Sequence, residues 1–290
     1  MRPPSSLSLA APRGGAADGP AEPDPWRTLI GFRHSLRLIA CGAAVMAASA
    51  GVMAAGDLRH SGFDDMSPAT QAMQRDDDQN PAMLWVQDGQ ALWAKRPAAG
   101  GQSCAECHGD AAVSQRGVAA RYPAFDDALN RPLSLNQRIA ECRRKHQTTE
   151  PPLAPESHPL LSLEAYLAMA SRGLPIAPPA DPRLDAYREL GHDWFTRRIG
   201  QLNLACTQCH DARAGQRLGG SLIPQAHPTA YPEYRLEWQS LGSLQRRIRN
   251  CMGGVRAEPF AFGAVEMTAI ELYLAQRAAG MRLEGAGVRP

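Results

Sequence analysis

Two segments of the chain carry apolar residues at three- and four-residue spacing and resemble each other. They are SLEAYLAMASRG, at residues 162–173, and EMTAIELYLAQRAAG, at residues 266–280. This spacing places the apolar side chains on one face of an α-helix, and a glycine closes each segment, as it commonly does after a helix. The pattern predicts two equivalent packing helices that end at Gly173 and Gly280.

The two helices belong to a longer internal repeat. YPAF begins 20 residues before Cys142, and YPEY begins 20 residues before Cys251. RIAEC, which ends at Cys142, matches RIRNC, which ends at Cys251, and EAYLA matches ELYLA. Self-similarity at a fixed distance indicates that one structural unit has been duplicated. The proline-rich segment GLPIAPPADPR, at residues 173–183, has the composition of a linker between the copies.

Each copy contains one C-x-x-C-H motif. The motif residues are Cys104, Cys107 and His108 in the first copy and Cys206, Cys209 and His210 in the second. In such a motif the two thiols bind the haem vinyl groups, and the histidine becomes the proximal ligand of the iron. The sequence therefore predicts a mainly α fold of two tandem cytochrome c-like domains, at residues 56–175 and 176–290, with two covalently bound haem c groups.

The N-terminal residues 1–55 have a different character. A Pro/Gly/Ala-rich extension, expected to be disordered, is followed by the basic RHSLR and an uncharged run at residues 38–55. This order is typical of a secretory signal peptide and predicts a periplasmic protein, from which Cys41 is removed with the signal. The alternative is a membrane anchor, since the run is 18 residues long. The formal net charge of +2 gives no reason to expect a nucleic-acid partner.

The sixth ligand of each haem iron has several candidates. Cysteine recurs in both copies, with Cys142 lying 35 residues after the first motif and Cys251 lying 42 residues after the second. The methionines that could serve instead, Met169, Met252 and Met267, do not recur at equivalent places. Cys142 and Cys251 could also form a disulfide, and His146 could ligate the first haem. The repeat favours thiolate ligation of both irons, because equivalent residues of a duplicated domain face equivalent pockets.

These motifs resemble the SoxA family, the dihaem subunits of SoxAX cytochromes. The resemblance extends over most of the chain after the signal, from about Trp85 to Gly280. It implies an L-cysteine S-thiosulfotransferase that joins thiosulfate to a cysteine of a SoxYZ-like sulfur carrier. It also implies a SoxX-like monohaem partner subunit and a cytochrome c electron acceptor.

The resemblance assigns a role to each motif residue. Cys104 and Cys107 would hold the first haem, with His108 and Cys142 as axial ligands, and Cys206 and Cys209 would hold the second, with His210 and Cys251 as axial ligands. Cys251 is then the active-site cysteine, found in the family as a persulfide, and Arg247 is the substrate-binding arginine.

The residues around Cys251 suit that chemistry. Positive charge favours the reactive thiolate, and an arginine can hold the sulfonate end of thiosulfate. Arg247 stands one helical turn before Cys251, and Gly253 and Gly254 remove side chains just after it. The first copy has bulky Arg143-Arg144-Lys145-His146 at that place, so we expect the chemistry in the second copy.

Two alternatives stay open at this point. Arg247 and its neighbours could pair with haem propionates, since Arg138 holds the same position in the first copy. The whole protein could be a dihaem electron shuttle without substrate chemistry, and an interaction scaffold for sulfur carriers would explain the basic patch but not the haems.

Overall fold

The order of the secondary-structure elements repeats along the chain. The computed structural model describes residues 57–98, 100–147 and 151–290, and residues 58–290 form one compact unit. The extension and signal peptide predicted at residues 1–55 lie outside the described residues. Among the helices that are described, none is long and apolar enough to cross a membrane.

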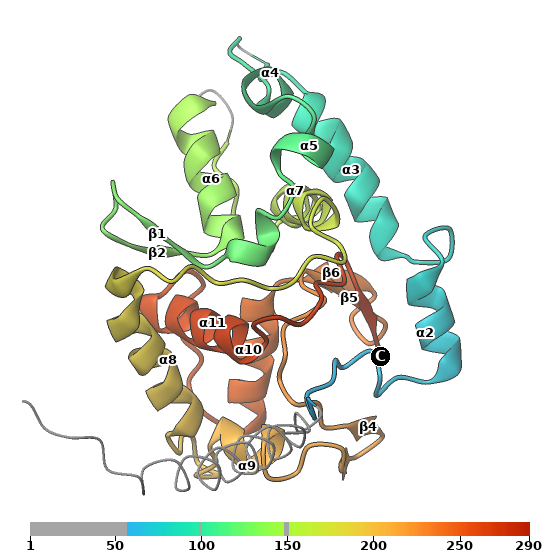
Figure 1. The fold of residues 1–290 in the computed structure, drawn as a ribbon, viewed down its shortest axis with the longest axis vertical. Coiled ribbons are helices and arrows are strands. Elements are labelled where there is room, and N and C mark those ends of the chain that lie inside the picture. Colours follow the sequence, from blue (N-terminus) through green and yellow to red (C-terminus); the bar gives the residue numbers. More distant parts are fainter. Residues whose placement is uncertain (1–56, 99, 148–150) are drawn as a thin grey trace, which may run out of the picture. The chain divides into compact units, whose positions relative to one another are not determined.

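The first copy contains α3 (Ala82–Ala94), α4 (Cys104–His108), α5 (Ala111–Ser114), η1 (Ala119–Arg121), β1 (Ala124–Asp126), β2 (Arg131–Leu133), α6 (Leu135–His146) and α7 (His158–Met169). The second contains η2 (Pro182–Leu184), α8 (Asp185–Thr196), α9 (Cys206–His210), β3 (Arg217–Leu218), β4 (Ser221–Leu222), β5 (Glu233–Arg235), β6 (Ser240–Gly242), α10 (Leu244–Gly254) and α11 (Val265–Arg277). Helix α2 (Pro68–Arg75) precedes the copies, and strand β7 (Val288–Arg289) follows them (Figure 1). This order confirms the predicted mainly α architecture and its duplication.

The two periodic helices end earlier than predicted. Helix α7 ends at Met169 and α11 at Arg277, and the chain then continues in turns to Gly173 and Gly280. Those glycines have φ values of 79° and 85°, which glycine adopts without steric cost. The glycine thus marks the end of the turn after each helix and not of the helix itself.

A glycine lies at the same helix crossing in each copy. Helix α3 packs against α7, and α8 packs against α11. A Cβ atom at Gly89 would lie 2.0 Å from the carbonyl oxygen of Ser162, and one at Gly191 would lie 2.1 Å from that of Ala269. Because real Cβ atoms do not approach backbone so closely, each crossing depends on its glycine.

A short antiparallel hairpin precedes the helix that carries each lone cysteine. In the first hairpin Ala124 pairs with Leu133, and in the second Glu233 pairs with Gly242. A serine follows each hairpin and caps the next helix, since the Ser243 hydroxyl oxygen accepts a hydrogen bond from the backbone N–H of Arg246 at 3.1 Å. Ser134 caps α6 in the same way, so in each copy a serine cap begins the helix that carries the lone cysteine (the cysteine helix).

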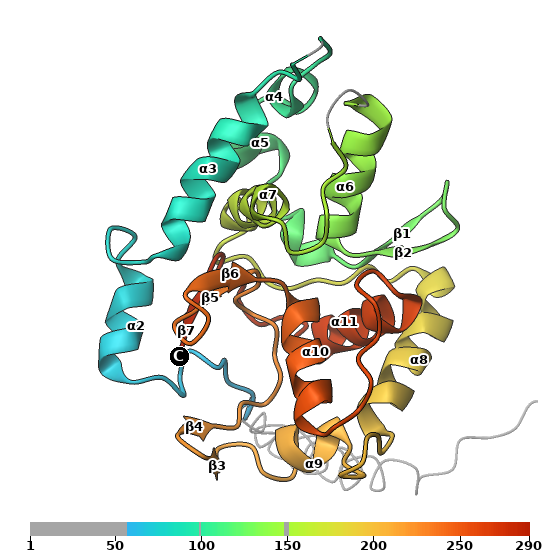
Figure 2. The same ribbon diagram turned by 180° about the vertical axis from the view of Figure 1, so that it is seen from behind.

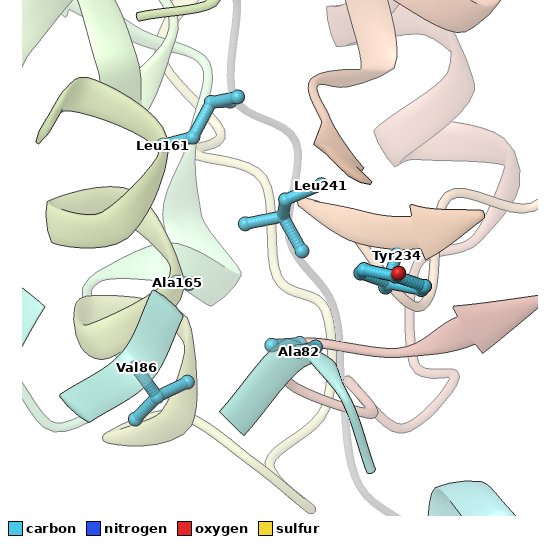
Figure 3. Close-up of a cluster of buried hydrophobic side chains, with 7 residues drawn as sticks. Ala82, Val86, Leu161, Ala165, Tyr234 and Leu241 are labelled. Carbon is cyan, nitrogen blue, oxygen red and sulfur yellow. The ribbon is translucent and has the colours of Figure 1, made fainter. Parts of the chain in front are cut away.

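One cluster of buried apolar side chains joins the two copies. Ala82 and Val86 of α3 and Leu161 and Ala165 of α7 pack in one cluster with Tyr234 of β5 and Leu241 of β6 (Figure 3). The ribbon in Figure 2, which is Figure 1 seen from behind, shows the second hairpin next to the helices of the first copy. Strand β7 extends that hairpin by pairing in parallel with β5.

The segment predicted as a linker also packs at its start. Ile176 is buried with Ala275, Ala278 and Leu283, and its N–H donates to the carbonyl oxygen of Met281 at 2.8 Å. The boundary that we predict at residues 175 and 176 therefore falls in a segment that is fixed against the second copy.

Candidate functional site

The second C-x-x-C-H motif lies against an apolar wall. Cys206 begins the one-turn helix α9 and packs in a cluster with Phe195 of α8 and Ile270 and Leu274 of α11. Burial, with a smaller contribution from the nearby Cys251, raises the pKa of the Cys206 thiol to about 11. The fold thus brings Cys251, from α10, close to the motif.

His210 is oriented by its backbone neighbourhood. Its Nδ1 lies 2.7 Å from the carbonyl oxygen of Pro224. Burial lowers the pKa of the imidazole, which favours the neutral ring. The proton lies on Nδ1, because the carbonyl oxygen beside it can only accept a hydrogen bond. In that tautomer Nδ1–H donates to Pro224 and Nε2 is left as a metal ligand, the arrangement expected of an iron-binding histidine.

Arg247 lies one turn before Cys251 on α10. Burial lowers the pKa of its guanidinium, but the neighbouring Cys251, Tyr231 and Glu233 more than offset this, and the net shift is upward. Its carboxylate partner is Glu237, at 3.8 Å, which is beyond hydrogen-bond distance. The Arg247 side chain is 31% exposed, so its donors face a partly open site.

The other arginines of this stretch are engaged elsewhere. Arg249 donates to the carbonyl oxygen of Phe260 and lies 4.6 Å from the ring centre of Phe262. Arg256 has a φ of 57° and lines a cavity of about 490 Å³. A Cβ atom at Gly253 or Gly254 would have no neighbour within 4 Å, so there is free space just after Cys251.

That cavity reaches the residue next to Cys251. Met252 lines it together with Trp194, Gly200, Glu258 and Phe260. Its wall includes one unsatisfied polar group, because the buried Nε1 of Trp194 has no hydrogen-bond partner. An indole N–H of this kind is suited to donate to a carboxylate of a bound group.

These features fit a covalently bound haem in the second copy. Cys206 and Cys209 would supply the two thiols that attach the haem, His210 would present Nε2 to the iron, and Cys251 would supply a sulfur ligand. The apolar wall suits the macrocycle, and Trp194 offers a free donor for a propionate.

The first motif is more exposed. Cys107 and His108 on α4 are both exposed, and Trp93 donates from Nε1 to the carbonyl oxygen of Gly109 at 3.0 Å. Cys142 on α6 lies near this motif. Burial raises the pKa of its thiol, and the nearby Cys107 adds to this rise. The first copy therefore also brings two thiols, a histidine and a lone cysteine together.

The alternative ligands are placed differently. His146 is exposed at the last residue of α6. Met169 accepts a contact from Arg172 Nη2 at 3.0 Å, and Met267 is fully buried in α11. The described cysteines, which include Cys142 and Cys251, are all free, so no disulfide joins these two.

The hairpins give the two equivalent arginines different carboxylate contacts. Arg138 forms an ion pair with Asp126, the last residue of β1, whose side chain is 6% exposed. The last residue of β5 is Arg235, which lies between Glu233 at 3.2 Å and Glu237 at 2.8 Å. A buried carboxylate thus occupies Arg138, whereas Arg247 has no such partner among the described residues.

Sequence reasoning did not single out Asp126, Arg235 or Glu237. The signal was present, because YPAFD and YPEYR align and differ in charge at their fifth residue. What the sequence did not show is that Asp126 pairs with the arginine of the following helix, whereas Arg235 pairs with Glu233 and Glu237.

The family model described as SoxA/TsdA, cytochrome c domain, matches residues 88–176 and 190–283, one C-x-x-C-H motif in each segment. The L-cysteine S-thiosulfotransferase subunit SoxA of Pseudaminobacter salicylatoxidans is 33% identical over 76% of this chain and 77% of that protein. SoxA of Allochromatium vinosum is 34% identical over 70% of this chain and 72% of that protein.

A solved structure has the same fold. The crystal structure of SoxXA from P. pantotrophus matches with a TM-score of 0.75 and 29% identity, over 80% of this chain and 87% of that chain. Cytochrome c domains bind haem c covalently, and the cysteines and histidines described above are the residues that such binding needs. The duplicated cytochrome c-like fold, the two matched segments and the similarity to SoxA proteins over most of their length together show that the chain belongs to the SoxA family of c-type cytochromes.

Proposed function

We propose that this chain is a periplasmic dihaem cytochrome that couples thiosulfate oxidatively to a cysteine of a SoxYZ-like sulfur carrier. Two haem c groups would be held by Cys104 and Cys107 and by Cys206 and Cys209. The axial pairs would be His108 with Cys142 and His210 with Cys251. The names of the relatives, L-cysteine S-thiosulfotransferase subunits, support this activity.

The observation that carries the proposal is the difference between the two arginines. Arg138 is neutralised by the buried Asp126, while the carboxylate nearest Arg247 lies 3.8 Å away on Glu237, whose side chain is 50% exposed. A dianion such as thiosulfate needs a cation whose hydrogen bonds are still free. Arg247 of the second copy offers such donors beside Cys251, whereas Arg138 of the first copy is paired with Asp126.

The residues of the second copy then have distinct roles. Arg247 binds the sulfonate end of thiosulfate and directs its outer sulfur toward the sulfur of Cys251. The open space at Gly253 and Gly254 admits the arm of the carrier. A bond between the outer sulfur and the carrier thiol releases two electrons and the thiol proton. Bound haem supplies one-electron acceptors, so the electrons leave one at a time through a SoxX-like subunit to a cytochrome c acceptor.

The two copies divide these tasks. Cys142 is followed by Arg143, Arg144, Lys145 and His146, and these side chains occupy the place of the two glycines in the second copy. We assign the first haem a structural or electron-transfer role and the second copy the sulfur chemistry.

The test is a reconstituted reaction of the purified chain with its partner subunit, a SoxYZ-like carrier, thiosulfate and oxidised cytochrome c. We expect acceptor reduction that depends on both thiosulfate and carrier, and a carrier cysteine peptide that gains both sulfur atoms of thiosulfate as a disulfide-linked –S–SO₃⁻ group. Mass spectrometry of the Cys251 peptide is expected to show one additional sulfur atom. Acceptor reduction without any modified carrier or Cys251 peptide would support the electron-shuttle alternative instead.

A further inference from the structure

A small cavity between the two copies contains two carboxyl groups that the proposed sulfur chemistry does not use. Its volume is about 80 Å³, and its wall repeats the internal symmetry of the chain. The equivalent pairs that line it are Tyr122 with Tyr231, Leu135 with Leu244, and Glu164 with Glu271. Glu164 comes from α7 and Glu271 from α11, the terminal helices of the two copies.

One of the two carboxyl groups is held by a fixed amide. Glu271 is 6% exposed and accepts a hydrogen bond from Gln245 Nε2 at 2.9 Å. The Gln245 Oε1 accepts from the backbone N–H of Gly263 at 2.8 Å, which fixes the amide with its nitrogen toward Glu271.

The other carboxyl group lacks a complete set of partners. The Oε2 atom of Glu164 is buried and has no hydrogen-bond partner. A buried carboxyl oxygen of this kind is normally satisfied by an ordered water or carries a proton itself. A cavity of this size has room for a few water molecules, and its two phenols and two carboxyl groups supply polar partners.

The charged surroundings of the pair are acidic. Each glutamate is also acted on by Glu156, from the loop before α7, and Glu164 by Glu271 itself. The other polar groups that face the pair are uncharged. They are the amides of Asn136 on α6 and Gln245 on α10, and the phenols of Tyr122 and Tyr231 before the two hairpins. Of the described groups that act on the pair, none is a cation.

Physical chemistry then limits the charge of the pair. Burial, together with the neighbouring carboxylates of Glu271 and Glu156, raises the pKa of Glu164 to about 8. Burial raises the pKa of Glu271 to about 7, against the opposing hydrogen bond from Gln245. Two carboxylates that share one buried site without a cation do not both ionise.

We propose that this cavity is a hydrated proton-binding site, in which Glu164 and Glu271 hold at least one proton at neutral pH and take up another when the protein is reduced. An electron added to either copy makes the neighbourhood of the pair more negative, which increases its affinity for a proton. Each uptake moves one proton from solvent to a carboxylate oxygen and breaks no bond in the protein. The link to reduction rests on the proposed haem groups; the bound proton does not.

The first test measures the protons directly. Infrared spectra of the complete haem-containing protein are expected to show the carbonyl-stretch band of a buried carboxylic acid at pH 7. The band should shift in D₂O and lose intensity in Glu164→Gln and in Glu271→Gln. Glu189→Gln, at an exposed position of α8, serves as the control and should leave the band unchanged. A band that neither cavity variant affects would overturn the proposal.

The second test uses thermal stability and does not depend on redox chemistry. Both folded-state pKa values lie above the ordinary value of 4.5, so the folded protein holds protons that the unfolded chain has released. The contribution of the pair is complete below pH 4.5 and is lost as the pH rises through about 7 and 8. Glu164→Gln is therefore expected to match the wild type in Tm at pH 5 and to exceed it at pH 9. A variant Tm that follows the wild type at both pH values would contradict a protonated pair.

The third test addresses the link to reduction. The haem midpoint potentials of the wild type should fall as the pH rises from 6 to 9, and this fall should be smaller in Glu164→Gln and Glu271→Gln. Potentials with the same pH dependence in all three proteins would overturn the redox link. A failure of thiosulfate coupling in an otherwise normal protein would instead count against the proposed function, because none of these measurements uses thiosulfate.

Discussion

Replacing Arg247 with alanine is expected to weaken the use of thiosulfate without unfolding the protein. The guanidinium stands one turn before Cys251 and makes no hydrogen bond to Glu237, from which it is separated by 3.8 Å. Its removal therefore takes away a substrate contact while leaving no buried carboxylate without a partner. The equivalent Arg138→Ala in the first copy is the matched control, since that arginine is bound to Asp126.

The expected magnitude follows from the exposure of the site. A hydrogen bond to a charged group contributes about 1.5–3 kcal/mol. The Arg247 side chain is 31% exposed, so solvent screening places the value at the lower end. A loss of about 1.5–2 kcal/mol corresponds to a decrease of roughly 10- to 30-fold in kcat/KM. Arg247→Lys should recover part of this, because an ammonium keeps the charge but loses the fork geometry of the guanidinium.

Arg138→Ala should have the opposite profile. Asp126 is 5% exposed, and without Arg138 its carboxylate keeps the backbone N–H of Leu129 but loses its cation. The Arg138 side chain is 36% exposed, so solvent screening reduces the cost of its removal to about 1–2 kcal/mol of folding free energy. In a protein of this size that lowers Tm by roughly 2–8 °C, while the KM for thiosulfate should stay near the wild-type value.

The assay is a titration of thiosulfate at saturating carrier and acceptor, with thermal denaturation and haem spectra of each variant. If Arg247→Ala and Arg138→Ala raised the KM for thiosulfate equally, the argument from the hairpin charges would be wrong. If Arg247→Ala changed the midpoint potential of the second haem and left the KM unchanged, the arginine would be a partner of a haem propionate.

Three further predictions concern the haems and the scaffold. Cys251→Ala should abolish thiosulfate coupling with haem still attached, whereas Cys142→Ala should alter the spectrum of the first haem and retain much of the activity; equal inactivity of the two would refute the division of labour. A pyridine haemochrome assay of the purified protein should give about two haems per chain, and a value near one would leave one motif empty. Gly191→Ala should lower the folding free energy by about 3 kcal/mol or more, because its Cβ would lie 2.1 Å from the carbonyl oxygen of Ala269. Gly220→Ala, where a Cβ has no neighbour within 4 Å, is the control, and equal Tm values for the two would contradict this packing argument.

Much of the fold follows from local sequence signals. The spacing of apolar residues in SLEAYLAMASRG and EMTAIELYLAQRAAG reflects burial along one helix face, and α7 and α11 lie there. The helix ends were less predictable, because the apolar pattern continues through the turns that lead to Gly173 and Gly280. The hairpins were missed, since strands of three residues are too short to show an alternating pattern.

The sequence named the cysteines and histidines of the candidate site, but it did not name the charged residues that pair with its arginines. The C-x-x-C-H motifs and the recurring cysteines are fixed in spacing, so their residues could be named from sequence, and the fold brings Cys251 next to Cys206. The partner of each arginine is set by packing between a hairpin and the next helix. That packing is tertiary, and so the roles of Asp126 and Arg235 emerged with the fold.

The duplication explains how one scaffold can support two different pockets. The serine cap that begins the cysteine helix and the glycine crossing of the two packing helices are the same in both copies and depend on shape and backbone hydrogen bonds. The residue that ends the hairpin is not part of that framework, so it can change sign while the helix keeps its place. With aspartate there, the arginine one turn before the cysteine is neutralised. With Arg235 there, Arg247 has no buried carboxylate within ion-pair distance among the described residues, and the proposed assignment of thiosulfate to the second copy rests on this difference.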